Sequence, residues 1–267
     1  MAKLRLLNHM LGRLIEPTKE KRYRNITSGY DFNGFKRIYL IHIRKTGGTS
    51  LNNMFLSLSG EDHASLYERL AASPLHRVLS NGLVFVGWNV ALINKGNYFY
   101  GFSHTPLYQL KLPAQTFTIT CFRDPASRVI SHYRMLMEYR DKNVDHPCMS
   151  TEGEWLGSSF EDFLRRIPKE HLCNQLYMFS PRFDVDEAVK RVANLSHYFF
   201  VEDFQNGIAE LCRKTGLKLS AMHIRKSSNK YKVSDKEMKM LREMQESEYA
   251  FLDRIRNMNH YRQPRID

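Results

Sequence analysis

The sequence predicts an α/β fold, a single domain in which helices flank a mostly parallel sheet. From residue 37 onward, apolar and β-branched runs alternate with segments of helical spacing, as strands and crossover helices do. The run IYLIHI over residues 38–43 is almost wholly apolar, which is typical of a strand buried on both faces of a parallel sheet. The 267 residues, of which 42% are hydrophobic, are enough for one sizeable core.

The chain is expected to divide into a basic N-terminal helix and linker over residues 1–36 and the α/β domain over residues 37–267. Leucines recur at helical spacing over residues 3–15, which predicts a helix there. The polar segment EPTKEKRYRN over residues 16–25 is expected to be a linker. We see no internal repeat and no low-complexity tract.

In the first half of the domain, strands are predicted from aromatic and β-branched runs, and helices from helical spacing between turn residues. Pro125 suits the first turn of a helix, and Pro74 stops one. We expect strands over residues 37–43, 81–89, 97–102 and 116–122, and helices over residues 49–58, 64–73 and 125–140.

The second half of the domain has clear helix signals. Ser234 followed by Glu237 forms a capping box, so the last helix is expected to begin near Asp235. Residues 184–195 place acids early and bases late, as the helix dipole favours. We also expect a helix over residues 159–167, a strand starting at residue 197 and a helix over residues 203–215.

The stretch RKTGGTS after the first strand has the features of an anion site. Its glycines let the backbone approach a phosphate, and the following helix start offers free N–H groups and the positive end of the dipole. The hydroxyls can cap the helix and donate to the anion, and the lysine adds a mobile charge. The candidate binding residues are Arg44, Lys45, Thr46, Gly47, Gly48, Thr49 and Ser50. The alternative without function is a glycine turn beside a surface lysine.

A second motif, RDPASRVISHY, covers residues 123–133. Arg123 ends a predicted strand, and Ser131 lies on the helix that follows. Together they can bind one phosphate, the arginine through a charge-assisted fork and the serine through its hydroxyl. The alternative is a helix start with an Arg–Asp surface pair.

The two motifs together resemble those of the sulfotransferases that use 3′-phosphoadenosine 5′-phosphosulfate (PAPS). K-T-G-G-T-S after a strand resembles their 5′-phosphosulfate loop, and R-D-P-x-x-R-x-x-S-x-Y resembles their 3′-phosphate motif. The resemblance is closest to the carbohydrate branch, which includes the heparan and chondroitin sulfotransferases, and it covers roughly residues 37–255. It implies a P-loop-like sheet and an enzyme that transfers a sulfuryl group from PAPS to a hydroxyl of a carbohydrate or similar acceptor. The product would be adenosine 3′,5′-bisphosphate.

The resemblance also implies roles for single residues. Lys45 would be catalytic, neutralising the bridging oxygen as it leaves. His104 follows a strand end between the motifs and is the candidate general base, because an imidazole can take a proton from a hydroxyl near neutral pH. The family's histidine commonly follows the glycine directly, whereas His104 lies two residues further along, and a helix-capping role is the alternative. Other candidate bases are Glu61, Asp62 and His63.

Two further segments are candidates for ligand contacts. The basic loop KSSNKYK resembles one that covers the 3′-phosphate and adenine in sulfotransferases of this type. Its candidate cofactor-binding residues are Lys226, Ser227 and Ser228, with Arg225 and Lys230 beside them. A looser resemblance makes Asn174, Gln175 and Tyr177 possible polar contacts, and Trp155 is either a stacking platform for a sugar or a buried anchor.

Charge and composition limit the partners. The formal net charge is +12, and residues 1–45 and 213–242 each contribute +8, so the basic segments flank or contain the candidate phosphate sites. This distribution favours an anionic cofactor, admits an anionic acceptor, and is unlike a uniform nucleic-acid-binding coat. No Asp/Glu/His spacing implies a metal, and the four cysteines are far apart.

No run of eighteen apolar residues predicts a transmembrane segment, and the first residues lack a signal-peptide cleavage site. We therefore expect a soluble, cytoplasmic enzyme of bacterial type; the alternative is a Golgi-lumen domain without its anchor. Two other function classes stay open. One is a P-loop-type nucleotide-dependent kinase, although in that loop the lysine follows the glycines, in G-x-x-x-x-G-K-[ST]. The other is a non-catalytic nucleic-acid-binding protein, for which no known module is present.

Overall fold

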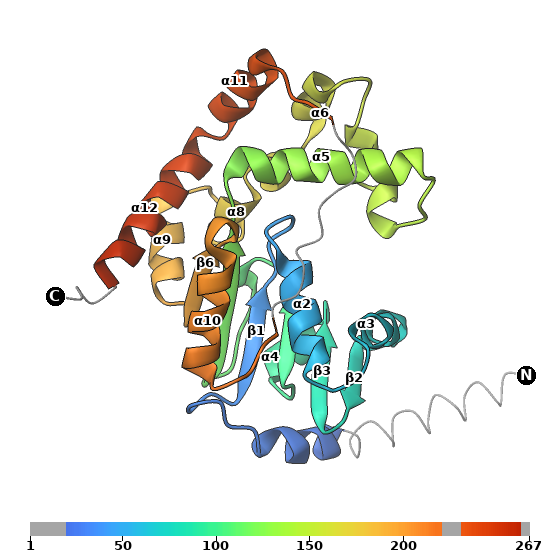
Figure 1. Cartoon of the computed structure of the whole chain (residues 1–267), viewed down its shortest axis with the longest axis vertical. Coiled ribbons are helices and arrows are strands. Elements are labelled where there is room, and N and C mark those ends of the chain that lie inside the picture. Colours follow the sequence, from blue (N-terminus) through green and yellow to red (C-terminus); the bar gives the residue numbers. More distant parts are fainter. Residues whose placement is uncertain (1–19, 221–230, 263–267) are drawn as a thin grey trace, which may run out of the picture.

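Six strands form one sheet in the order β2-β3-β4-β1-β5-β6 in the computed structural model, which describes residues 20–220 and 231–262 (Figure 1). Only the pair β2 and β3 is antiparallel. The strand bounds are β1 (Arg37–Ile41), β2 (Arg77–Ser80), β3 (Leu83–Gly87), β4 (Tyr100–Ser103), β5 (Thr116–Phe122) and β6 (His197–Phe200). The mostly parallel sheet confirms the predicted fold class.

Helices cover both faces of this sheet because successive strand residues point to opposite sides. Ile38 and Leu40 of β1 pack with one set of helices, and Tyr39 and Ile41 pack with the other. The first set is α2 (Gly48–Ser57), α3 (His63–Ala72) and α10 (Phe204–Thr215). The second set is α4 (Val90–Lys95), α9 (Val185–Ala193) and α12 (Glu246–Arg262).

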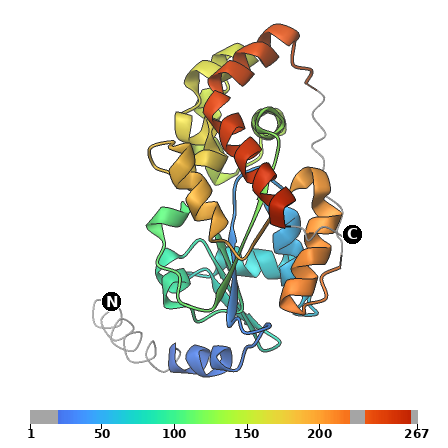
Figure 2. The same cartoon turned by 90° about the vertical axis from the view of Figure 1, so that its left-hand side faces the viewer.

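A third apolar core lies beyond the carboxyl ends of the strands, where a helical layer covers that edge of the sheet (Figures 1 and 2). Val129 and Tyr133 of α5 pack there with Phe160 and Phe163 of α6 and with Leu241 of α11. The layer contains α5 (Pro125–Asp141), η2 (Pro147–Ser150), η3 (Gly153–Trp155), α6 (Phe160–Arg166), α7 (Lys169–Leu172), α8 (Asn174–Tyr177) and α11 (Asp235–Met244). Ligands of open parallel sheets bind at this edge, so the layer forms a roof over the expected site.

Several local predictions are confirmed. Pro125 starts α5, and Ser234 and Glu237 form the capping box in front of α11, which begins at Asp235. The strand expected over residues 81–89 is shorter, because Asn81 and Gly82 form the two-residue turn of a β2–β3 hairpin, both with positive φ. Strand β2 and helix α4, which Asn89 caps, were not predicted from the sequence.

The prediction of a linker over residues 16–25 is wrong from Glu20 onward, because residues 20–28 form a helix. Glu20 forms an ion pair with Arg77, whose guanidinium lies over the ring of Tyr23 at 3.8 Å. Tyr23 and Ile26 also pack against the core on the α9 and α12 side. Tertiary contacts therefore stabilise a segment whose composition favours a linker. The helix expected over residues 3–15 lies outside the described residues.

Candidate functional site

The glycine loop, residues 44–50, joins the carboxyl end of β1 to the start of α2. Lys45 and Gly47 adopt left-handed backbone conformations, with φ of 66° and 84°. Gly47 is the N-cap residue of α2, and no side chain caps the helix. The prediction that Thr49 and Ser50 cap it is therefore wrong. The first turn of a helix still offers backbone N–H groups that lack partners further back in the helix, as an anion site requires.

Gly48 has a specific steric reason to be glycine. A Cβ at this position would lie 2.0 Å from Cδ2 of His42, so the imidazole fills the place of a side chain. His42 follows β1, and its pKa is lowered well below the ordinary value by burial and by the neighbouring His104 and Arg44. The neutral His42 ring thus forms a wall of the glycine loop.

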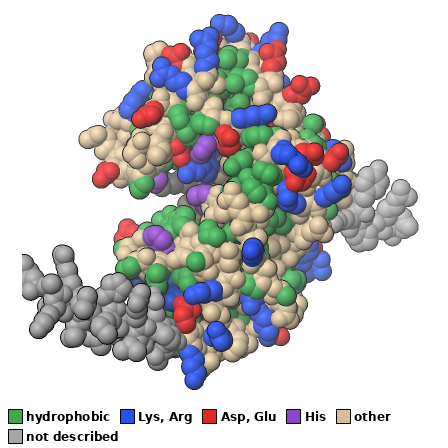
Figure 3. Space-filling model, turned by 180° about the vertical axis from the view of Figure 1, so that it is seen from behind, with side chains coloured by type: hydrophobic (Ala, Val, Ile, Leu, Met, Phe, Trp, Pro, Cys, Tyr) green, Lys and Arg blue, Asp and Glu red, His purple; other side chains and the backbone are tan. Residues whose placement is uncertain are grey.

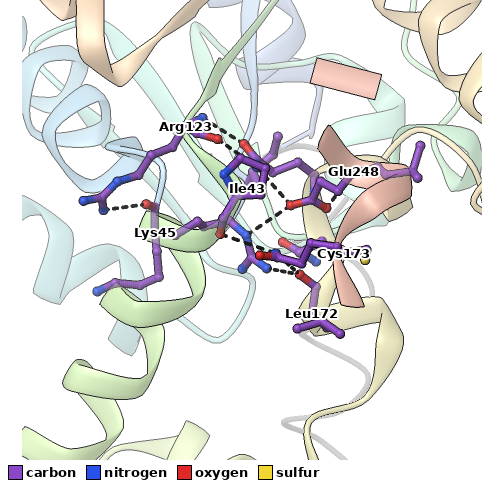
Figure 4. Close-up of polar contacts among 12 residues, drawn as sticks. Ile43, Lys45, Arg123, Leu172, Cys173 and Glu248 are labelled. Carbon is purple, nitrogen blue, oxygen red and sulfur yellow. Dashed lines mark hydrogen bonds and ion pairs between the residues drawn. The ribbon is translucent and has the colours of Figure 1, made fainter. Parts of the chain in front are cut away.

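The two predicted phosphate motifs are in direct contact. Arg123, at the end of β5, donates a hydrogen bond of 3.2 Å from Nη1 to the carbonyl oxygen of Lys45 (Figure 4). In the same view the side chains of Lys45 and Arg123 extend to the same side of the loop. Lys45 Nζ lies 3.4 Å from Sδ of Met135 on α5, and Ser131 lies one helical turn before Met135. Ser131 is therefore on the face of α5 toward Lys45.

A buried polar network fixes the backbone of Arg123. The Gln175 side-chain amide accepts a hydrogen bond from the Arg123 N–H at 2.8 Å and donates one to its carbonyl oxygen at 2.9 Å. Glu248 of α12 accepts hydrogen bonds from the Gln175 backbone and side chain, both at 3.0 Å. Arg128 pairs with Glu248 at 3.6 Å, and both side chains are fully buried. The C-terminal helix thus helps to orient the second motif (Figure 4).

A second polar group, the histidine cluster, consists of His42, His104, His132 and His171. Figure 3 shows that the molecule is hollowed between its helical layer and its sheet, with histidine side chains (purple) gathered there. The rings of His42 and His104 lie 4.4 Å apart, and those of His132 and His171 lie 6.4 Å apart. The charges of Arg44 and Glu152 act on His104, and Glu152 also accepts a hydrogen bond from His132, so the two pairs share one site.

His104 is held in a defined tautomer. Its Nδ1 lies 2.6 Å from the carbonyl oxygen of His42, which can only accept, so the neutral ring donates from Nδ1 and carries its lone pair on Nε2. Burial, and then the charge of Arg44, lower the pKa of His104 to about 4. His104 is therefore neutral at pH 7 and can accept a proton.

Glu152, which the sequence analysis missed, connects this cluster to the glycine loop. It lies between η2 and η3, forms an ion pair with Arg44, and accepts a hydrogen bond of 2.7 Å from His132 Nε2. Its side chain is only 4% exposed. The Arg44 guanidinium, predicted to bind the cofactor, is thus engaged by Glu152. No local pattern in the sequence marks this partnership.

The alternative bases lie elsewhere. Glu61, Asp62 and His63 follow the carboxyl end of α2, about 15 Å of helix away from the glycine loop. Glu61 pairs with Arg69 and accepts a hydrogen bond from Ser80, and Asp62 caps α3. The structure therefore separates Glu61, Asp62 and His63 from the two motifs. His104, in contrast, lies close to the glycine loop, because it bonds to the His42 carbonyl oxygen.

The other residues that were predicted to contact ligands lie in different parts of the structure. Trp155 is half-buried, with its ring 4.6 Å from that of His171 at the histidine cluster. Asn174 donates to the carbonyl oxygen of Glu170 within the helical layer, and Tyr177 packs on Tyr108. The predicted cofactor residues Lys226, Ser227 and Ser228, with Arg225 and Lys230, lie outside the described residues.

Over residues 20–220 and 231–262 no group of three or more His, Cys, Asp or Glu side chains has a metal-binding arrangement. In the same part of the chain, no helix has the length and apolar character needed to span a bilayer.

Comparison with known proteins identifies the family. The family description that matches is "Sulfotransferase family", over residues 28–260. A comparison with curated proteins gave no match. The matched region contains the six described strands, both predicted phosphate motifs and the histidine cluster. The resemblance seen in the motifs is thus confirmed at the level of the family, and the chain belongs to the sulfotransferase family of transferases.

Proposed function

We propose that this protein transfers a sulfuryl group from PAPS to a hydroxyl of a carbohydrate or similar acceptor. The observation that carries the proposal is the hydrogen bond between Arg123 and the Lys45 carbonyl oxygen, which joins two anion-binding motifs at the carboxyl ends of adjacent strands. A ligand with phosphate-type groups at two positions fits such a paired site. Sulfotransferase membership makes PAPS the natural candidate.

The residues present fit this donor. Gly47 in the left-handed region and Gly48 beside the His42 ring place no side chain at the start of α2, where a phosphate can approach helix N–H groups, which suits the 5′-phosphosulfate. Arg123 and Ser131 would hold the 3′-phosphate, and residues 226–228 would add contacts from the basic loop. When bound, PAPS supplies the sulfuryl group and an anionic leaving group.

The side chains of the chain have separate tasks in this reaction. Lys45, on the same side of the loop as Arg123, would neutralise charge that develops on the leaving oxygen. The Nε2 atom of His104 would accept the proton of the acceptor hydroxyl, because Nδ1 of the same ring donates its hydrogen bond to the His42 carbonyl oxygen. Positioning and charge stabilisation would therefore supply most of the catalysis.

The acceptor is proposed to lie at the histidine cluster. Half-buried Trp155 lies next to His171, and an aromatic ring beside polar groups is a suitable platform for a sugar. This arrangement supports a carbohydrate acceptor.

Ligand-dependent thermal stability tests the donor assignment. Adenosine 3′,5′-bisphosphate should raise Tm, because a ligand that binds only the folded state stabilises it, whereas ATP and single-stranded DNA should not. Transfer of labelled sulfate from PAPS to a panel of carbohydrate and phenolic acceptors then tests the reaction. Stabilisation by ATP alone would favour the kinase alternative, and stabilisation by DNA alone would favour the nucleic-acid-binding alternative.

A further inference from the structure

Arg44 follows His42 by two residues, and the His42 carbonyl oxygen lies 2.6 Å from His104 Nδ1, so the positive charge of Arg44 acts on the proposed base. Burial lowers the pKa of His104 most, and the charge of Arg44 lowers it further. A general base becomes an imidazolium in the transition state. An uncompensated Arg44 would therefore raise the energy of the state that His104 must reach during the reaction.

Glu152 supplies a compensating charge. Burial alone would raise the pKa of Glu152, but the hydrogen bond from His132 and the charges of His132 and Arg44 hold this pKa below its ordinary value. Glu152 is therefore ionised at neutral pH, and its charge raises the pKa of His104, opposite to the effect of Arg44. The ion pair of Arg44 with Glu152 also fixes the guanidinium in place.

Two imidazoles also act on His104. His42 approaches from the end of β1 at 4.4 Å between ring centroids, and burial keeps its pKa well below the ordinary value. His171 approaches from α7, and burial also lowers its pKa. Both rings are neutral at pH 7. Among the described groups named here as acting on His104, Arg44 and Glu152 thus carry charge at neutral pH.

We propose that Glu152 is a positioning residue that, by holding Arg44 and balancing its charge, allows His104 to take up the proton of the acceptor. This inference rests on the proposed function. In the step, the acceptor O–H bond breaks and its proton goes to His104 Nε2 while the oxygen attacks sulfur. The bond from sulfur to the bridging oxygen of the donor breaks, and the departing adenosine bisphosphate keeps the electron pair. Glu152 takes part in no bond change.

Turnover of three variants tests the role of the charge balance. Glu152→Gln should lower kcat by at most about tenfold for each unit by which the pKa of the base falls, with little change in the Kd for adenosine 3′,5′-bisphosphate. The double variant Arg44→Met/Glu152→Gln should recover most of this loss, because the unbalanced cation is also gone. Glu154→Gln, which removes an exposed carboxylate two residues away, should leave kcat unchanged. A double variant no faster than Glu152→Gln would overturn the inference.

Histidine NMR provides a readout that does not depend on the reaction. In ¹³C-histidine-labelled protein, with the His104 signal identified by its loss in His104→Asn, the pKa of His104 should rise in Arg44→Met and fall in Glu152→Gln. Arg44 is 29% exposed in its side chain, so its replacement tests the balance even if Glu152→Gln does not fold. An unchanged pKa of His104 in Arg44→Met would overturn the inference. Absence of sulfate transfer in the unmodified protein, with the NMR shifts as expected, would instead count against the proposed function.

Discussion

The guanidinium of Arg123 lies 3.2 Å from the carbonyl oxygen of Lys45, so the end of β5 is tied to the loop that follows β1. The Gln175 amide fixes the Arg123 backbone from the other side through both its N–H and its C=O. Arg123 is thus anchored before any ligand binds, and its donors need little reorganisation to meet a phosphate. Burial lowers its pKa, but a guanidinium stays charged at any physiological pH.

This anchoring gives the first prediction. Arg123→Ala should weaken binding of adenosine 3′,5′-bisphosphate by about 2–3 kcal/mol, because a charge-assisted contact with a phosphate is lost. Isothermal titration calorimetry on folded protein measures the change. Arg140→Ala removes an exposed arginine of α5 that pairs with Asp141 and should bind normally. Unchanged affinity in Arg123→Ala would show that this residue is not a phosphate ligand.

The second prediction concerns the base. His104→Ala should lower turnover by roughly 10²–10⁴-fold while sparing donor binding, since no general base remains to take the proton of the acceptor hydroxyl. His63→Ala serves as the control, because it removes another histidine at the far end of α2. Steady-state kinetics with saturating PAPS compares the two variants. If the His63 variant were slow and the His104 variant normal, the assignment of the base would have to be reversed.

The third prediction concerns Lys45. Lys45→Ala should lower turnover more than it weakens donor binding, because a charge on a leaving oxygen matters most in the transition state. Arginine should rescue poorly, since its rigid fork does not replace a compact ammonium. Lys45→Gly should lose activity equally without destabilising the fold, because glycine accepts the φ of 66° at no steric cost.

Single-turnover rates at saturating donor and calorimetric affinities distinguish the outcomes for Lys45. A full rate in the alanine variant would end the assignment of Lys45 to the leaving oxygen. Reduced affinity with an intact rate would reduce Lys45 to a ground-state phosphate contact.

The fourth prediction concerns the contact between Gly48 and His42. Gly48→Ala should destabilise the protein by about 1–3 kcal/mol, because the new methyl group meets the imidazole. The double variant His42→Ala/Gly48→Ala should recover part of this loss, and urea unfolding measures all three stabilities. Gly29→Ala, whose nearest contact would be an ordinary 3.7 Å, should change stability by less than about 0.5 kcal/mol. Full stability of Gly48→Ala would contradict the steric explanation.

The fifth prediction concerns pH. Burial lowers the pKa of His104, His132 and His197 to about 4 in the folded protein. Because the unfolded histidines bind protons from about pH 6.5 downward, the unfolded state takes up protons first, and the free energy of unfolding falls from about pH 6.5 to about pH 4. Each residue contributes on the order of 3 kcal/mol to this loss.

Urea unfolding at pH 7.5, 5.5 and 4.5 measures the fall. His197 lies away from the histidine cluster, bonded to the carbonyl oxygen of Gly207, so His197→Gln should flatten the pH dependence without a change in turnover. A free energy of unfolding that is constant from pH 7.5 to pH 4.5 would contradict the buried neutral state of these rings.

Local patterns were sufficient for most of the elements and for the two motifs. The apolar run of β1, Pro125 at the start of α5 and the capping box of Ser234 and Glu237 are all fixed by neighbours a few residues away. Even the missed strand β2 had a local signal, since Asn81-Gly82 is a strong hairpin turn. The order of lysine and glycines likewise determined that the loop resembles that of a sulfotransferase and not that of a kinase.

Tertiary structure alone decided how the site is assembled. Glu152 is 108 residues from Arg44, and Gln175 is 52 residues from Arg123, so no spacing in the sequence links these partners. The helix over residues 20–28 likewise depends on contacts with Arg77 and the core. Helical periods, caps and turns come from interactions between near neighbours, whereas a buried charge is tolerated only where distant segments bring it a partner. The sequence therefore determined which groups the chain carries, and packing decided which of them meet.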